Sequence, residues 1–157
     1  MGGRRILAGL SGAVAFGLGA AFADNAPSPD FFSKFSAADA VVLAIRSDFA
    51  PAGGHVRLTV FDDQTTFLEK AAGKHEGTVD DAGLTLITLK DLKPGEYAFV
   101  AYLDENDDGR LNRNALGKPK EPYIFSNDVK PKLRKPTFDE TKVEVAPGEV
   151  VVLTLED

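Results

Sequence analysis

The strongest constraint on the fold is a series of short apolar segments separated by turn-forming residues. In His55–Phe61 apolar and polar residues alternate, which places Val56, Leu58 and Val60 on one face of an extended strand. Further segments with the length and apolar content of strands are 40–46, 84–89, 97–103, 143–145 and 150–155, with a short edge at 78–79. The Pro-Gly pairs at Pro94 and Pro147 fit tight turns between strands. This pattern predicts an all-β chain, an antiparallel immunoglobulin-like β-sandwich of about seven strands.

One short helix and one long loop interrupt the predicted strands. Thr66–Glu69 matches a capping box, and the apolar side chains of 67, 68, 71 and 72 would form a helical stripe that Gly73 ends. Residues 104–141 contain no convincing strand. Loops of this length in a compact domain are usually functional or are ordered by something bound to them. We therefore expect the chemistry of the chain in this segment.

The N-terminus has the features of a bacterial secretory signal peptide. Arg4 and Arg5 precede an uncharged stretch, and Ala21–Ala23 forms a small-residue cleavage site. Residues 1–23 are thus predicted to be removed on export to the periplasm or beyond, with an uncleaved anchor as the alternative; the arginine pair partly matches a twin-arginine signal. Residues 24–38, with three phenylalanines, would form a linker or an N-terminal cap, and 39–157 the sandwich domain without a further membrane span.

Composition excludes several classes of function. The chain has 18 basic against 24 acidic residues, a net charge of −6, which argues against nucleic-acid binding. It has no cysteine, which excludes disulfides, thiolate metal sites and cysteine nucleophiles. No nucleophile elbow, phosphate-binding loop or dinucleotide motif is present in the sequence. We therefore expect a non-enzymatic protein, and the weakest alternative is an envelope hydrolase that uses paired carboxylates.

Residues 104–112 resemble part of a calcium-binding loop. Oxygen-bearing side chains stand at every second position, Asp104, Asn106 and Asp108. Gly109 permits a sharp bend, and Arg110 offers its backbone carbonyl. Ala115 stands where such loops have a bidentate glutamate, so Glu121 or Asp128 would have to supply the missing ligand. The predicted ligands of this Ca²⁺ site are Asp104, Asn106, Asp108, Arg110, Asn112 and Glu121. We expect weak binding, with a Kd on the order of 10⁻⁴ to 10⁻³ M; the alternative is a plain turn that binds no metal.

Two aromatic residues suggest a second binding site. Tyr123 and Phe125 are two positions apart and share one face of an extended segment. They would either pack the loop onto the sheet or form a platform for an envelope glycan or peptide, with Lys118, Lys120 and Glu121 at its rim. The basic run 130–135 is typical of a solvated loop, with binding of an anionic ligand as the alternative.

The stretch from Leu92 to Asn127 resembles a family of exported bacterial proteins, the domain of unknown function numbered 2141. The shared features are Pro94-Gly95 with Tyr97, the Asp104 to Gly109 loop and the block 116–127 (LGKPKEPYIFSN); the later 136–140 (PTFDE) is similar too. Ile124 stands where the family tends to have Gly, and Asp128 where it often has a second Asn. The resemblance implies a transthyretin-like or carboxypeptidase-regulatory-like sandwich in the bacterial envelope, and it implies no reaction.

Overall fold

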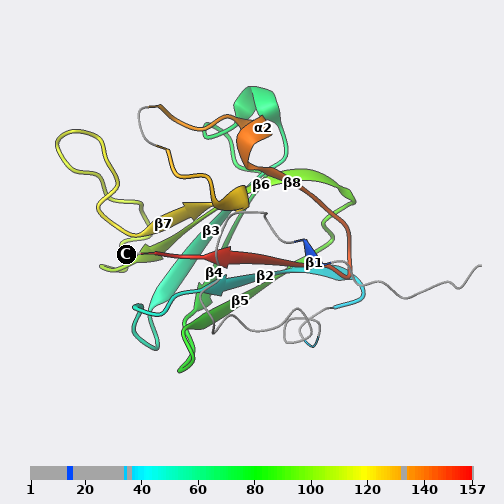
Figure 1. Ribbon diagram of the computed structural model, residues 1–157, viewed down its shortest axis with the longest axis horizontal. Coiled ribbons are helices and arrows are strands. Elements are labelled where there is room, and N and C mark those ends of the chain that lie inside the picture. Colours follow the sequence, from blue (N-terminus) through cyan, green and yellow to red (C-terminus); the bar gives the residue numbers. More distant parts are fainter. Residues whose placement is uncertain (1–13, 16–33, 35–36, 132–133, 157) are drawn as a thin grey trace, which may run out of the picture.

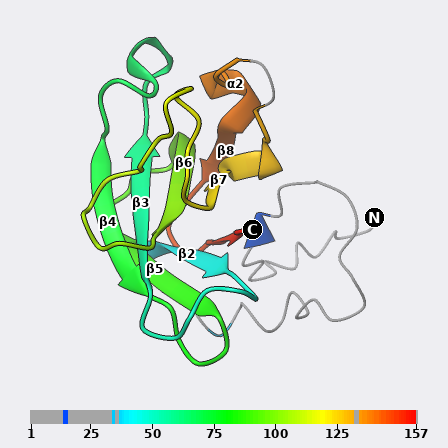
Figure 2. The same ribbon diagram turned by 90° about the vertical axis from the view of Figure 1, so that its left-hand side faces the viewer.

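The computed structural model describes residues 14–15, 34, 37–131 and 134–156. Within them, two β-sheets pack face to face (Figures 1 and 2). The predicted all-β sandwich is therefore confirmed. The predicted leader and N-terminal cap lie outside the described residues, apart from 14–15, 34 and 37–38. None of the helices in the described ranges has the length and hydropathy needed to cross a membrane.

The first sheet has the strand order β1-β9-β2-β5. It contains β1 (Val14–Ala15), β2 (Ala40–Arg46), β5 (Leu84–Lys90) and β9 (Val150–Thr154). β2 and β5 are antiparallel, as predicted, whereas β9 runs parallel to β2 and to β1. The last strand, β9, thus lies in the same sheet as β2, whereas β8, which precedes it in the sequence, lies in the other sheet.

The second sheet has the order β4-β3-β6-β7, and β8 also pairs with β6. Its strands are β3 (His55–Phe61), β4 (Gly73–Thr78), β6 (Gly95–Asp104), β7 (Tyr123–Phe125) and β8 (Lys142–Val145). β8 pairs with the first half of β6 and β7 with the second half, while β3 pairs along the other edge. β3 and β6 are consequently inner strands whose two edges are both occupied.

Alternation along the strands divides side chains between the core and the outer face. Leu58 on β3, Phe99 on β6, and Leu43 and Leu153 on the facing sheet are all buried in one cluster between the sheets. The intervening residues Thr59, Val100 and Tyr102 point away from this core, as the two-residue period of a strand requires. The outer face of β3, β6 and β7 is therefore available to form a site.

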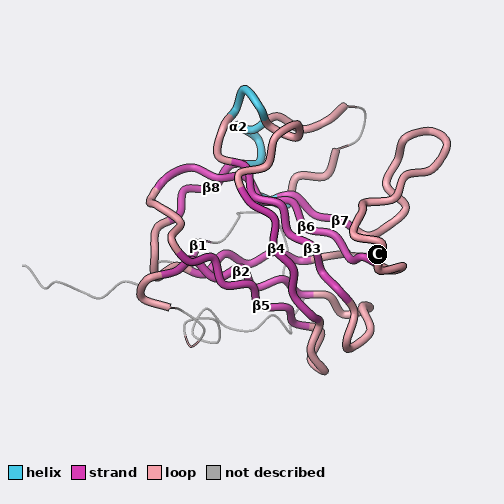
Figure 3. Tube along the Cα trace, turned by 180° about the vertical axis from the view of Figure 1, so that it is seen from behind, coloured by secondary structure: helices cyan, strands magenta, loops and turns pink. Residues whose placement is uncertain are grey.

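The helices lie elsewhere than predicted. The expected helix at 66–72 is absent: a 3-10 turn, η1 (Gln64–Thr66), is capped by Asp63, and Leu68 then adopts a positive φ of 64°, which ends helical geometry. A helix forms instead at α2 (Phe138–Thr141), with a complete capping box between Thr137 and Glu140. The segment 104–141, predicted to lack strands, also contains β7 and the turn η2 (Ser126–Asp128). Its longest irregular part, between β6 and β7, projects from the sandwich (Figure 3).

Candidate functional site

The loop between β6 and β7 folds back on itself as an irregular hairpin. Arg113 and Pro119 form an isolated antiparallel bridge, and the Asn114 amide donates to the Lys118 carbonyl at 2.8 Å. Gly117, with φ of 76°, makes the turn, and Leu116 beside it is 84% exposed. The loop thus has a defined shape and carries an exposed leucine at its tip.

The Asp104 carboxylate holds the start of this loop. Its Oδ1 accepts a hydrogen bond from the Asp108 amide at 3.1 Å, and its Oδ2 accepts one from the Gly109 amide at 2.9 Å. The side chain is completely buried, and Arg57 Nε donates to Oδ2 at 3.0 Å. Arg57 also pairs with Glu76 and, at 3.1 Å, with Asp107. Asp104 therefore joins the loop backbone to an arginine of β3.

Glu121 holds the other end of the loop in the same way. Its side chain is buried, and its two oxygens accept hydrogen bonds from the Glu105 amide at 3.2 Å and the Asn112 amide at 2.8 Å. Both carboxylate oxygens are thus used by the loop backbone. The prediction that Glu121 binds a metal stays a prediction. Its expected position at the rim of the aromatic site is not observed, because the side chain is buried and bonded to the loop backbone.

Three other predicted ligands, Asn106, Asp108 and the Arg110 carbonyl, converge on the side chain of a fourth, Asn112. Asn112 Nδ2 lies 3.0 Å from Asp108 Oδ2, 3.4 Å from Asn106 Oδ1 and 3.3 Å from the Arg110 carbonyl oxygen. The hydrogen bond from Asn112 is the main cause of a lowered pKa at Asp108, which keeps that side chain charged. Across the residues that the structure describes, no group of three or more His, Asp or Glu side chains is arranged to hold a metal ion. Any ion here would depend on amide and carbonyl oxygens as well.

A groove of about 640 Å³ lies on the outer face of β3, β6 and β7. Two cross-strand rows form its floor: Thr59, Val100 and Phe125 in one, and Tyr102 opposite Tyr123 in the other. Tyr123 and Phe125 meet edge to face, with ring centroids 5.9 Å apart. Burial raises the pKa of Tyr102, so its hydroxyl stays protonated and able to donate.

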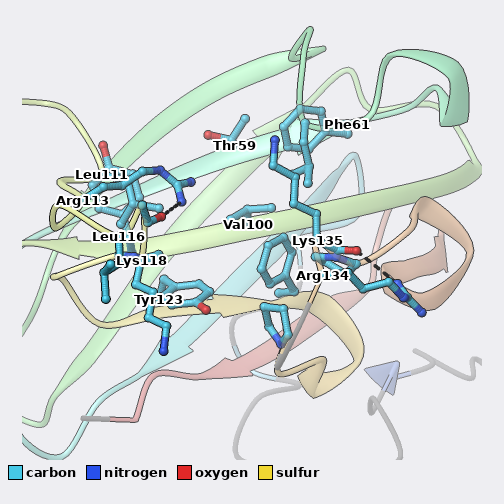
Figure 4. Close-up of a pocket in the computed structure, with 17 residues that line it drawn as sticks. Thr59, Phe61, Val100, Leu111, Arg113, Leu116, Lys118, Tyr123, Arg134 and Lys135 are labelled. Carbon is cyan, nitrogen blue, oxygen red and sulfur yellow. Dashed lines mark hydrogen bonds between the residues drawn. The ribbon is translucent and has the colours of Figure 1, made fainter.

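Two loops form the walls of the groove, and both are basic. Arg113, Lys118 and Leu116 come from the hairpin on one side, and Arg134 and Lys135 come from the segment before α2 on the other (Figure 4). Lys120, predicted at the rim, does not line the groove. Arg134 is held by Glu140, with nitrogen–oxygen distances of 2.8 and 2.6 Å. Among the residues that the structure describes, none of those lining the groove is acidic.

Ser126 and Asn127 fasten the second wall to the sheet. The Ser126 hydroxyl is fully buried; it accepts a hydrogen bond from the Phe99 amide at 2.9 Å and donates one to the Thr141 carbonyl. Asn127, at φ of 60°, donates to the Lys142 carbonyl at 2.7 Å. These contacts position α2 and the segment before it at the edge of the groove.

Sequence reasoning found part of this site. The structure brings Tyr123 and Phe125 together on one face, as their spacing predicts. The sequence analysis did not identify Arg57, Tyr102 or Arg113 as site residues. Arg57 and Tyr102 have one sequence signal, an outward position in an alternating strand, and Arg113 has none. Ile124, between the two aromatics, points into the main core.

Comparison with known proteins gives a family but no activity. The model of a family described as an uncharacterised protein conserved in bacteria, DUF2141, matches residues 47–152. No curated protein matches the sequence. Among solved structures, the major plantain pollen allergen Pla l 1 is similar at a TM-score of 0.34 and 13% identity, over 74% of this chain and 92% of that chain. A likeness at that level carries no argument about function.

Proposed function

This chain belongs to DUF2141, a bacterial family without a described activity, and we propose that it is an exported, non-catalytic binding module whose ligand occupies the groove over β3, β6 and β7. The observation that carries this proposal is the aromatic floor between two loop walls. Concave sites with aromatic side chains and a few polar groups are typical of ligand binding. Export to the cell envelope is proposed from the leader-like sequence of residues 1–23.

The groove offers both apolar and polar contacts. Tyr123 is partly exposed, and Leu116 at the loop tip is free to contact a ligand lying against that ring. Neither the Tyr102 hydroxyl nor the Tyr123 hydroxyl forms a hydrogen bond with any of the described residues. Ring faces that stack and hydroxyl groups that donate and accept suit a ligand with rings and polar substituents.

A binding screen tests this proposal. Labelled protein without residues 1–23 is applied to glycan and peptide arrays, and hits are mapped by amide chemical shifts. We expect shifts at Tyr102 and Tyr123 and about a tenfold loss of affinity in Tyr123→Ala. Leu86→Ala, which removes an exposed apolar side chain on the other sheet, is the matched control and should bind normally. Hits that Tyr123→Ala binds as well as the wild type does would reject the groove as the site.

A second proposal is that Ca²⁺ stabilises the hairpin loop. It is supported by the convergence of Asn106, Asp108 and the Arg110 carbonyl on the side-chain amide of Asn112. These oxygens, with Asn112 presenting its oxygen in place of its nitrogen, would hold a hard cation, while Asp104 stays bound to Arg57. The bound ion would neutralise Asp108 and link the two sides of the loop.

Thermal unfolding with added metal tests the calcium proposal. At a hundredfold excess over Kd, Ca²⁺ should add about 2.7 kcal/mol to the free energy of unfolding. Asp108→Asn should abolish the shift, whereas Asp107→Asn, a neighbouring exposed acid outside the converging set, should keep it. An absent shift at millimolar Ca²⁺, or an equal one in Asp108→Asn, would reject the site.

A further inference from the structure

The groove differs in charge from the rest of the molecule. The whole chain has 24 acidic and 18 basic residues, yet Arg113, Lys118, Arg134 and Lys135 line the groove and no acid does. A cleft lined by one sign of charge concentrates ligands of the opposite sign. In an acidic protein this local reversal indicates what the groove attracts.

Three of these four cations are free to meet a ligand. Arg134 is neutralised by its paired contact with Glu140. Arg113 donates to the Gly117 carbonyl at 2.8 Å, a neutral partner that leaves its charge uncompensated. Within the described residues neither Lys118 nor Lys135 forms a salt bridge, and the two approach the floor from opposite walls (Figure 4). A ligand that spans the floor would therefore meet positive charge at both ends.

The floor favours a glycan over a peptide. Extended peptides gain affinity by adding a strand to an open sheet edge. Here the floor is a sheet face: β3 and β6 are paired along both edges, and the terminal strand β7 is only three residues long, so a peptide backbone would find only a short free edge beside the groove. Sugar rings, in contrast, offer C–H faces to Tyr123 and hydroxyl groups to the two tyrosine hydroxyls.

We infer that the ligand is an acidic glycan, with rings against Tyr123 and acid groups bound by Arg113, Lys118 and Lys135; this inference rests on the groove function proposed above. The guanidinium of Arg113 suits a carboxylate or sulfate by its fork of donors, and the lysines act as mobile point charges. Binding should therefore weaken as salt screens these exposed charges.

Matched oligosaccharides test this inference. The probes are oligogalacturonate and oligoglucuronate, each beside its carboxyl-esterified form, a sulfated oligosaccharide beside its desulfated form, and poly-glutamate as the acidic peptide. We expect at least one acidic glycan to bind about tenfold more tightly than its neutral counterpart, with a Kd that rises with salt. Lys118→Gln with Lys135→Gln should remove most of that difference. Lys120→Gln, the same charge change on the same loop but outside the groove, should leave it intact.

The outcomes separate this inference from the proposal beneath it. Equal binding of acidic and neutral glycans, still sensitive to Tyr123→Ala, would overturn the acidic ligand and leave the groove as a binding site. Binding of poly-glutamate alone would overturn the glycan in favour of an acidic peptide. If neither acidic glycans nor poly-glutamate bind, the inference fails, and the array screen with Tyr123→Ala decides the groove independently. Thermal unfolding of each variant ensures that lost binding is not lost folding.

Discussion

Arg57 on β3 and Asp104 at the end of β6 form the ion pair that fastens the long loop to the sheet. Arg57 Nε lies 3.0 Å from Asp104 Oδ2, and the Asp104 side chain is completely buried while Arg57 is 24% exposed. The same carboxylate accepts the Asp108 and Gly109 amides. An acid predicted as a metal ligand is thus also the structural support of its own loop.

Replacing Asp104 should therefore loosen the loop whether or not a metal binds there. Asp104→Ala leaves two loop amides without an acceptor, and we expect a loss of about 1.5–3 kcal/mol in the free energy of unfolding. Urea unfolding measures the loss, and hydrogen exchange at the Asp108 and Gly109 amides locates it. Asp107→Ala removes only an exposed contact to Arg57 and should have little effect. Equal losses in the two variants would contradict this account.

Ser126 should matter for stability more than its size suggests. Its buried hydroxyl links the Phe99 amide of β6 to the Thr141 carbonyl at the end of α2. Ser126→Ala leaves both backbone groups buried without this partner, and we expect a cost of about 1–3 kcal/mol in chemical denaturation. Chemical shifts should change on β6 and α2. Unchanged stability would mean that water replaces the hydroxyl there.

A repeated sequence pattern shows why local reasoning misplaced the helix. Thr-Phe-x-Glu occurs at 66–69 and at 137–140, and only the second copy forms a capped helix. In the first copy Asp63 caps an earlier turn and Leu68 takes a positive φ, while Phe67 packs edge to face between Phe61 and Phe138. Tertiary packing of one aromatic ring thus outweighs a local preference worth about 1 kcal/mol.

The strands and the aromatic pair were predictable because both follow from the two-residue period. The alternation in His55–Phe61 assigns the core face without any tertiary information. The sequence singled out Lys118 and the basic run 130–135 as separate features. That they face one groove from opposite walls was not predictable, because this arrangement requires that β7 pairs with β6 and that Ser126 fixes α2. A long-range arrangement of this kind leaves no periodic signal in the sequence.

Acid should weaken the second wall of the groove. The Arg134 guanidinium, followed by the Thr137 amide, lowers the pKa of Glu140 from 4.5 to about 2. Because the folded-state pKa is below the unfolded one, the stabilisation is complete above about pH 4.5 and is lost as the pH falls toward 2. We expect Glu140→Gln to be less stable than the wild type at neutral pH, with the difference closing in acid. A constant difference across this range would mean that the charge of Glu140 adds nothing to the free energy of unfolding.

Gly83 should be the glycine least able to accept a side chain. It has φ of 73°, and a Cβ there would lie 2.0 Å from the Ser47 carbonyl oxygen, a backbone atom beside the hydrogen bond from the Ser47 amide to Gly83. Gly83→Ala should cost about 2–4 kcal/mol, from the left-handed backbone and the overlap together. Gly53→Ala is the matched control, because it has φ of 84° but no atom within 4 Å, and should cost about 1–2 kcal/mol. The difference in denaturation midpoint isolates the steric contact, and equal losses would show that the strand ends can move apart without cost.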